Sequence, residues 1–209
     1  MNGQFIVIEG LEGAGKSTAV RTIQSWLEEK RIEYITTREP GGTPLAERLR
    51  DLVKNFHDES ITSETELLLM YAARSQLIAN KIRPALNEGK WVIGDRHDLS
   101  SRAYQGGGRQ LPMSQLDQLR NLVLGNFRPS LTLYLDIDPV LGLSRARHRG
   151  DLDRIEKQQI DFFERVREVY LDEQRRDSTI FKVDASQSIE EINHHINQIL
   201  EKFLQENRI

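Results

Sequence analysis

The sequence of 209 residues contains no cysteine. Disulfide bonds and metal sites built from thiolates are therefore excluded. Long hydrophobic runs are also missing, because no stretch approaches the ~20 apolar residues that a membrane-spanning helix needs. The first residues, Met1 to Gln4, lack the basic start and the cleavage site of a signal peptide. These absences lead us to expect a cytoplasmic protein without a membrane contact.

The chain has no excess of positive charge. Its 29 Lys and Arg residues face 32 Asp and Glu residues, which gives a formal net charge of -3. This balance argues against general binding to nucleic acids. The length suits one compact domain over residues 1–209, since we find no repeat, low-complexity segment or linker that would divide it.

Apolar segments rich in β-branched residues alternate with segments of helical periodicity. We expect strands from Phe5 to the glycine at position 10 and at 33–37, 90–96, 131–136 and 179–184. Helices are expected at 16–30, 45–55, 63–87, 139–147, 155–176 and 188–203, with a glycine-rich loop at 106–109 between two further helical stretches. Such alternation predicts an α/β fold with a five-stranded parallel sheet covered by helices on both faces.

The most specific motif directly follows the first strand. Positions 10–17 fit the P-loop pattern G-x-x-x-x-G-K-[ST], with a helical segment behind it. Glycines allow successive N–H groups to converge on phosphate oxygens, and the helix adds its positive N-terminal end. The sequence therefore predicts an ATP-binding loop made of Gly10, Leu11, Glu12, Gly13, Ala14, Gly15, Lys16, Ser17 and Thr18.

Charged residues also follow other predicted strands. They stand at the carboxyl ends of these strands, where open parallel sheets bind their ligands. Asp95 ends an apolar strand, and together with the Ser17 hydroxyl it is our candidate for holding the Mg²⁺ that accompanies ATP. The alternative is that Asp95 only caps the next turn. Arg96 is suited to a bidentate grip on phosphate.

Further arginines indicate which kind of phosphoryl-transfer reaction to expect. Arg38, Arg74 and Arg96 come from separate segments that can flank one cleft. A second set, Arg145, Arg147 and Arg149, stands before Gly150 and suggests a lid over about 145–154, although a solvated basic helix end is the alternative. Two arginine sets with a P-loop favour a kinase whose acceptor is itself a phosphate.

Several motifs in this order resemble thymidylate kinase. They are Thr37–Thr43 (T-R-E-P-G-G-T), Asp95–His97 (D-R-H), Ala103–Gly106 (A-Y-Q-G) and the arginine-rich segment before Asp153 and Arg154. The similarity is to the bacterial form, in which the lid supplies the catalytic arginine. It covers nearly the whole chain and implies the P-loop fold of nucleoside monophosphate kinases.

The resemblance implies phosphorylation of dTMP to dTDP by ATP and Mg²⁺, as a step of dTTP biosynthesis. It gives catalytic roles to Lys16, Arg96, Arg149 and Glu12, with Glu12 near the sugar 3′-hydroxyl. Arg145 is implied to bind ATP and, with Arg147, to assist Arg149, whereas Asp184 and Ala185 are implied to lie beside the adenine ring. The implied contacts to dTMP come from Glu12, Arg38, Pro40, Met70, Arg74, Arg96, Ser101, Tyr104 and Gln105. The family also implies a homodimer.

One position departs from the family pattern. Met70 stands four residues before Arg74, where the family usually has a phenylalanine that stacks on thymine. A thioether can cover a base without ring stacking, or Met70 can simply belong to the core. Three alternative functions stay open at this point: a kinase for another nucleoside monophosphate, a P-loop regulatory switch and a non-catalytic nucleotide-binding module.

Overall fold

The fold is built on one parallel β-sheet. The computed structural model describes residues 3–55, 58–148 and 153–207. Within them, five strands pair in the order β2-β3-β1-β4-β5, and every pairing is parallel. Their bounds are Phe5–Gly10 (β1), Tyr34–Arg38 (β2), Trp91–Asp95 (β3), Leu131–Asp136 (β4) and Ile180–Asp184 (β5). The predicted five-stranded parallel sheet is confirmed.

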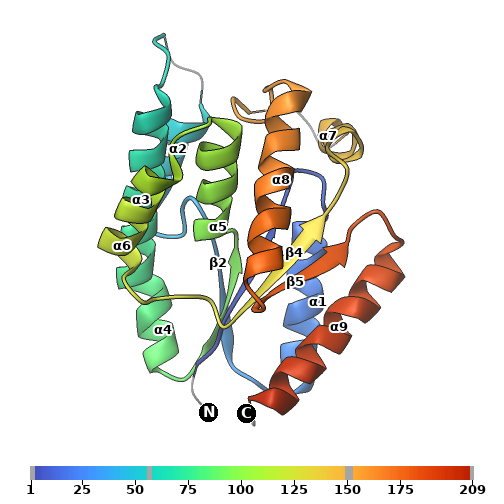
Figure 1. Ribbon diagram of the computed structural model, residues 1–209. Coiled ribbons are helices and arrows are strands. Elements are labelled where there is room, and N and C mark those ends of the chain that lie inside the picture. Colours follow the sequence, from blue (N-terminus) through green and yellow to red (C-terminus); the bar gives the residue numbers. More distant parts are fainter. Residues whose placement is uncertain (1–2, 56–57, 149–152, 208–209) are drawn as a thin grey trace.

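Helices cover the sheet on both faces. Figure 1 shows α1 and α9 side by side, with α3, α4 and α6 grouped away from them. The helices are α1 (Lys16–Glu29), α2 (Pro44–Lys54), α3 (Ser63–Leu77), α4 (Arg83–Asn87), α5 (Asp98–Ser101), α6 (Met113–Leu124), α7 (Pro139–Arg147), α8 (Ile160–Arg176) and α9 (Ile189–Glu206). Two segments are wound as π-helix, η1 (Ile78–Ile82) and η2 (Arg102–Gly108). In the part of the chain that the structure describes, no helix is long and apolar enough to cross a bilayer.

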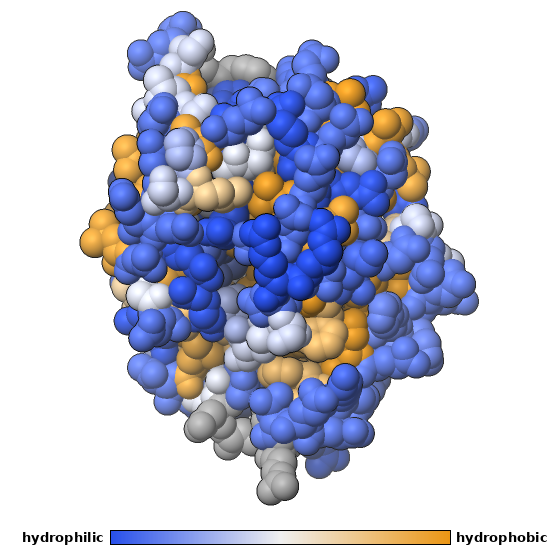
Figure 2. Space-filling view, in the orientation of Figure 1, coloured by the Kyte–Doolittle hydropathy of each residue, from blue (hydrophilic) through white to orange (hydrophobic). Residues whose placement is uncertain are grey.

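The two faces of β1 show how the core is divided. Phe5 and Val7 pack in one cluster with Leu77 of α3, whereas Ile6 and Ile8 belong to another cluster with Trp26 of α1. This alternation is the period of two that a strand imposes on its side chains. Both clusters are buried, and the space-filling view in Figure 2 shows mainly hydrophilic side chains with separate hydrophobic patches.

The glycine-rich segment at 106–109 is not the loop that we expected, because most of it belongs to η2. The reason is a close approach of η2 to α8. A Cβ on Gly107 would lie 2.8 Å from the Arg165 carbonyl oxygen, and one on Gly108 would overlap the Phe162 ring. Glycines therefore serve here to bring two helical backbones together and not to break a helix.

The start of α8 also differs from the prediction of about residue 155. Asp153 Oδ1 accepts hydrogen bonds from the Ile155 and Glu156 backbone N–H groups, both at 2.9 Å, and holds a separate turn there. The helix begins only at Ile160. By contrast, the predicted helical run over 63–87 is confirmed, because α3, η1 and α4 follow one another without interruption.

Trp91 offers a test of this core. Its side chain is fully buried in β3, between Trp26 of α1 and Phe203 of α9. We expect Trp91→Ala to lower the free energy of unfolding by about 3–5 kcal/mol in a urea titration, because it leaves a large cavity. Ile189→Ala, at an exposed position of α9, is the control and should change it by about 0.5 kcal/mol or less. Similar losses in both variants would contradict this assignment of the core.

Candidate active site

A cavity of about 190 Å³ lies beyond the carboxyl ends of β1, β2 and β3. We call it the central cavity. Side chains from the P-loop, both neighbouring strand ends, α3 and η2 line it, and they include Glu12, Lys16, Arg38, Pro40, Met70, Asp95, Arg96, Tyr104 and Gln105. All nine were predicted as site residues, so the structure brings together groups that are up to 93 positions apart in the sequence (Glu12 to Gln105).

Lys16 lies inside the curve of the P-loop. Its Nζ donates hydrogen bonds to the carbonyl oxygens of Gly10, at 3.1 Å, and Leu11, at 2.9 Å. Burial and the nearby Arg96 guanidinium lower the pKa of Lys16 to about 8, although Asp95, Glu12 and Glu9 act in the opposite direction. Burial and one neighbouring cation therefore disfavour the charged form of Lys16, and an incoming phosphate would stabilise that form.

Glu12, Arg96 and Tyr104 form a hydrogen-bonded triangle on the cavity wall. Arg96 Nη2 donates to Glu12 Oε1 at 2.6 Å and to the Tyr104 hydroxyl at 3.1 Å, while that hydroxyl donates to Glu12 Oε2 at 2.7 Å. Burial alone would raise the pKa of Glu12, but the charges of Arg96 and Lys16 lower it below its usual value. Glu12 is therefore held as a carboxylate beside two cations.

The backbone presents Arg96 in an unusual conformation. Its φ is 72°, in the left-handed region that few residues other than glycine adopt. The Arg96 N–H donates to the Ile8 carbonyl oxygen at 2.9 Å, and Nη1 donates to Ser100 Oγ at 3.0 Å. The strained turn after β3 thus directs the guanidinium toward the P-loop instead of away from the sheet.

Behind this triangle lies Glu9, a buried residue whose role the sequence did not reveal. Its carboxylate accepts hydrogen bonds from the His97 N–H at 2.8 Å, Ser100 Oγ at 2.5 Å and the Tyr170 hydroxyl at 2.9 Å. Burial raises the pKa of Glu9, although the charge of Arg96 and these hydrogen bonds act to lower it. Glu9 fixes the turn after β3, and the only sequence signal for it was a charge inside an apolar strand.

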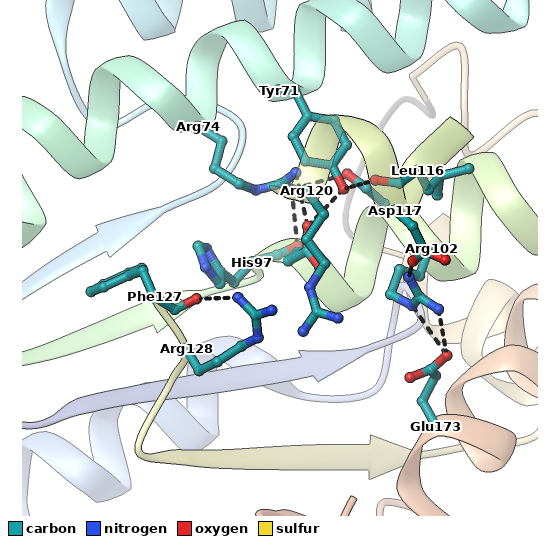
Figure 3. A network of polar contacts seen from close by, with 12 residues as sticks. Tyr71, Arg74, His97, Arg102, Leu116, Asp117, Arg120, Phe127, Arg128 and Glu173 are labelled. Carbon is teal, nitrogen blue, oxygen red and sulfur yellow. Dashed lines mark hydrogen bonds and ion pairs between the residues drawn. The ribbon is translucent and has the colours of Figure 1, made fainter. Parts of the chain in front are cut away.

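Arg74 is completely buried behind the cavity wall. As Figure 3 shows, it projects from α3 toward the segment that carries His97. Its guanidinium donates to Glu39 Oε2 at 2.7 Å, the His97 carbonyl oxygen at 3.1 Å and Ser101 Oγ at 2.9 Å. Neither Arg74 nor Ser101 is among the residues that line the central cavity. Arg74 Nη1 makes no hydrogen bond within the described residues, but it forms an ion pair with Asp98 Oδ1 at 3.7 Å.

A second pocket adjoins the central cavity and shares Arg38 and Asp95 with it. Ser17 and Thr37 also line this pocket. The Asp95 Oδ1 atom is buried without a hydrogen-bond partner in the described part of the chain, so it is available to a ligand. No group of three or more His, Cys, Asp or Glu residues stands ready for a metal within the described residues. One carboxylate and one hydroxyl nevertheless suit Mg²⁺, which keeps several waters and binds substrate phosphates.

Arg145, predicted to bind ATP, lies beside the segment predicted for the adenine ring. Arg145 of α7 donates from Nη1 to the Ala185 carbonyl oxygen at 2.8 Å, and Asp184 accepts from the Ser186 N–H at 2.9 Å. Thr18 lines a groove between α1 and α9, and of the predicted P-loop residues only Glu12 and Lys16 line the central cavity. Arg149 lies outside the described residues.

Two basic residues of α2 were missed by the sequence analysis. Arg50 and Lys54 both line the central cavity, and Arg50 Nη1 donates to the Pro40 carbonyl oxygen at 2.8 Å. Burial and the charge of Arg38 lower the pKa of Arg50. These residues carry no motif, since only the packing of α2 beside the cavity distinguishes them from other surface cations of a helix.

The helix α7 touches the P-loop backbone directly. A Cβ on Gly142 would lie 2.7 Å from the Glu12 carbonyl oxygen, and one on Gly13 would overlap the Gly142 carbonyl oxygen. The two glycines therefore permit a contact that places α7, with Arg145, against the phosphate-binding loop.

The sheet order and the glycine loop between β1 and α1 define a P-loop kinase of the nucleoside monophosphate class. The family model for thymidylate kinase matches residues 8–196. The chain is 58% identical over 208 residues to the thymidylate kinase of Pseudoalteromonas translucida, which covers 100% of both chains. It is also 58% identical over 203 residues to that of Colwellia psychrerythraea (97% of this chain, 96% of the relative) and over 206 residues to that of Vibrio parahaemolyticus (98% of each). The chain therefore belongs to the thymidylate kinase family, as predicted.

The contact between α7 and the P-loop can be tested with Gly142→Ala. Helix propensity alone would make this change stabilising by about 1 kcal/mol. We expect instead that the new Cβ displaces the loop and weakens the binding of ATP with Mg²⁺ by on the order of 10-fold in calorimetric titrations, since small displacements in such sites are costly. Ser144→Ala, at an exposed position of the same helix, should leave the affinity unchanged. An unaltered affinity in Gly142→Ala would show that the contact does not shape the loop.

Proposed function

We propose that this chain transfers the γ-phosphoryl group of ATP to dTMP and so produces ADP and dTDP. The observation that carries the proposal is the Glu12–Arg96–Tyr104 triangle beside Lys16, in a chain that belongs to the thymidylate kinase family along almost its whole length. In phosphoryl transfer the protein contributes mainly position and electrostatic stabilisation, and this cavity offers both.

The charges around the cavity suit two phosphate groups that approach one another. Lys16 and the N–H groups at the start of α1 would hold the ATP phosphates. Arg96 and Arg38 line the same cavity from the ends of β3 and β2 and would bind the phosphate of dTMP. Arg38 is exposed and paired with Glu47 at 3.0 Å, so it can exchange this partner for a phosphate.

Ser17 and Asp95 are the residues that would hold Mg²⁺, and the free Asp95 Oδ1 supports this assignment. When bound, the ion would neutralise charge on the ATP phosphates. Asp95 and Arg96 are neighbours in the sequence. At the end of β3, Asp95 would therefore bind the metal ion and Arg96 would bind the acceptor phosphate.

The nucleoside of dTMP would lie against Tyr104, Met70 and Gln105, which line the central cavity. Tyr104 is held against Glu12 and would meet the deoxyribose, where it would exclude a 2′-hydroxyl. Met70 and Gln105 would contact thymine. Arg74 would donate to a thymine carbonyl through Nη1, which makes no hydrogen bond within the described residues and lies 3.7 Å from Asp98 Oδ1. Ser101 would then orient Arg74 without contacting the base itself.

The lid residues complete the proposal. Arg145 lies beside Ala185 and Asp184, where the adenine of ATP would bind. Arg149 is our choice for the cation that neutralises charge in the transition state, with Arg145 and Arg147 assisting.

We also propose one domain over the whole chain and a homodimer in solution. Leu68 of α3 and Leu122 of α6 are 56% and 81% exposed, and the two helices pack against each other. We place the interface on these two helices because a second copy would remove both leucines from water. Sedimentation analysis tests this assembly, and a monomer at micromolar concentration would contradict it. The expected cytoplasmic localisation stays a prediction.

The activity is tested by ADP formation from ATP and Mg²⁺ with dTMP, dUMP, dCMP, dGMP, UMP and AMP offered separately. We expect a strong preference for dTMP, and a reaction without acceptor gives the background of ATP hydrolysis. Preferred turnover of another monophosphate would overturn the acceptor but keep the phosphoryl transfer. No turnover with any acceptor would contradict the proposed function.

A further inference from the structure

Glu66 of α3 is a buried carboxylate that the proposed mechanism does not use. Its side chain is 1% exposed and lies where α3, the end of η2 and the segment after residue 152 meet. Oε1 accepts hydrogen bonds from Gln105 Nε2 at 2.9 Å and Arg109 Nε at 3.2 Å. Oε2 accepts from Arg109 Nη2, at 3.1 Å, and from Arg154 Nη2. One side chain thus connects three separate segments.

These partners keep Glu66 ionised. Burial raises the pKa of a carboxyl group, but the hydrogen bonds and charges of Arg109 and the hydrogen bonds from Gln105 and Arg154 lower that of Glu66 below its usual value. An ionised carboxylate can only accept hydrogen bonds. Every group that points at Glu66 must therefore be a donor.

This requirement fixes the orientation of Gln105. Its amide has one donor end and one acceptor end, and the donor end must turn toward Glu66. The acceptor, Oε1, is left without a hydrogen-bond partner among the described residues. Gln105 lines the central cavity together with Met70. The cavity wall can therefore offer a hydrogen-bond acceptor to a bound base at this point.

Glu66 also holds the segment that closes the cavity on the side of α2. Arg154 Nε donates to the Val53 carbonyl oxygen at 3.0 Å, and Lys54 Nζ pairs with Asp153 at 2.6 Å. Asp153 and Ile155 line the central cavity. The hydrogen bond from Arg154 to Glu66 therefore joins this wall to the same carboxylate that orients Gln105.

We propose that Glu66 is a positioning residue that sets the base preference of the central cavity by directing Gln105 Oε1 toward the acceptor base. This inference rests on the proposed function. A base with a ring N–H, such as thymine or uracil, can donate to Oε1. Cytosine has a lone pair at the equivalent ring nitrogen and would leave two acceptors facing each other, which is unfavourable in a buried site.

The test replaces Glu66 by glutamine, which keeps the size but adds a donor end. Gln105 can then turn around and present its NH₂ group to the cavity. We expect Glu66→Gln to reduce the ratio of the kcat/KM values for dTMP and dCMP by on the order of 10-fold, mainly through KM. The ratio for dTMP and dUMP should stay the same, because both bases carry the ring N–H.

Two controls separate this role from a general loss of packing. Glu64→Gln changes an exposed carboxylate in the first turn of the same helix and should leave both ratios unaltered. General loosening of the cavity in Glu66→Gln would change the dTMP to dUMP ratio as well, and that result would overturn the proposal. An unchanged dTMP to dCMP ratio in a folded Glu66→Gln variant would overturn it too.

The exchange variant Glu66→Gln with Gln105→Glu covers the case in which Glu66→Gln does not fold. It keeps the total charge of the cluster, and residue 105 again presents an oxygen to the cavity. We expect its dTMP to dCMP ratio to lie within about 3-fold of the unmodified enzyme and above that of Gln105→Leu, which has no acceptor. A ratio no higher than in Gln105→Leu would overturn the proposal. If the unmodified enzyme does not phosphorylate dTMP at all, the proposed function fails and not this assignment alone.

Discussion

The hydrogen bonds around the Arg96 guanidinium are the interaction on which the rest of the site depends. Arg96 occupies a strained backbone position, and its side chain is held by Glu12, Tyr104 and Ser100. These partners belong to the P-loop, η2 and α5. Because they surround the guanidinium, it is held in place, and binding the acceptor phosphate, as we propose, would not require it to be ordered first.

Three buried glutamates support this arrangement from different directions. Glu9 fixes the turn after β3, Glu39 pairs with Arg74, and Glu66 holds Arg109 and Arg154. Burial raises the pKa of Glu9, whereas cationic partners lower the pKa values of Glu39 and Glu66 despite their burial. Buried charges are costly unless they are paired, so each carboxylate strongly restricts where its partners can lie.

The sequence predicted the sheet and the P-loop because both depend on local signals. Buried parallel strands are recognisable as short apolar runs, and the P-loop needs glycines at fixed spacing. The π-helical conformation of η2 could not be predicted in the same way. Its glycines are needed for the close contact with α8, which lies more than 50 positions later in the sequence. The pairing of Arg74 with Glu39 and the roles of Glu9, Glu66 and Arg50 likewise follow from contacts between distant segments.

We propose that the planar fork of the Arg96 guanidinium, and not its charge alone, organises the acceptor site. The most direct measurement is the turnover of dTMP by an Arg96→Lys variant, with its melting temperature recorded beside it. Lysine keeps the charge, but its donors share one nitrogen and cannot reproduce the planar fork that binds Glu12 and Tyr104 through Nη2 and Ser100 through Nη1. We predict that kcat falls by on the order of 10²-fold or more in a folded variant. Turnover equal to that of the unmodified enzyme would contradict this account.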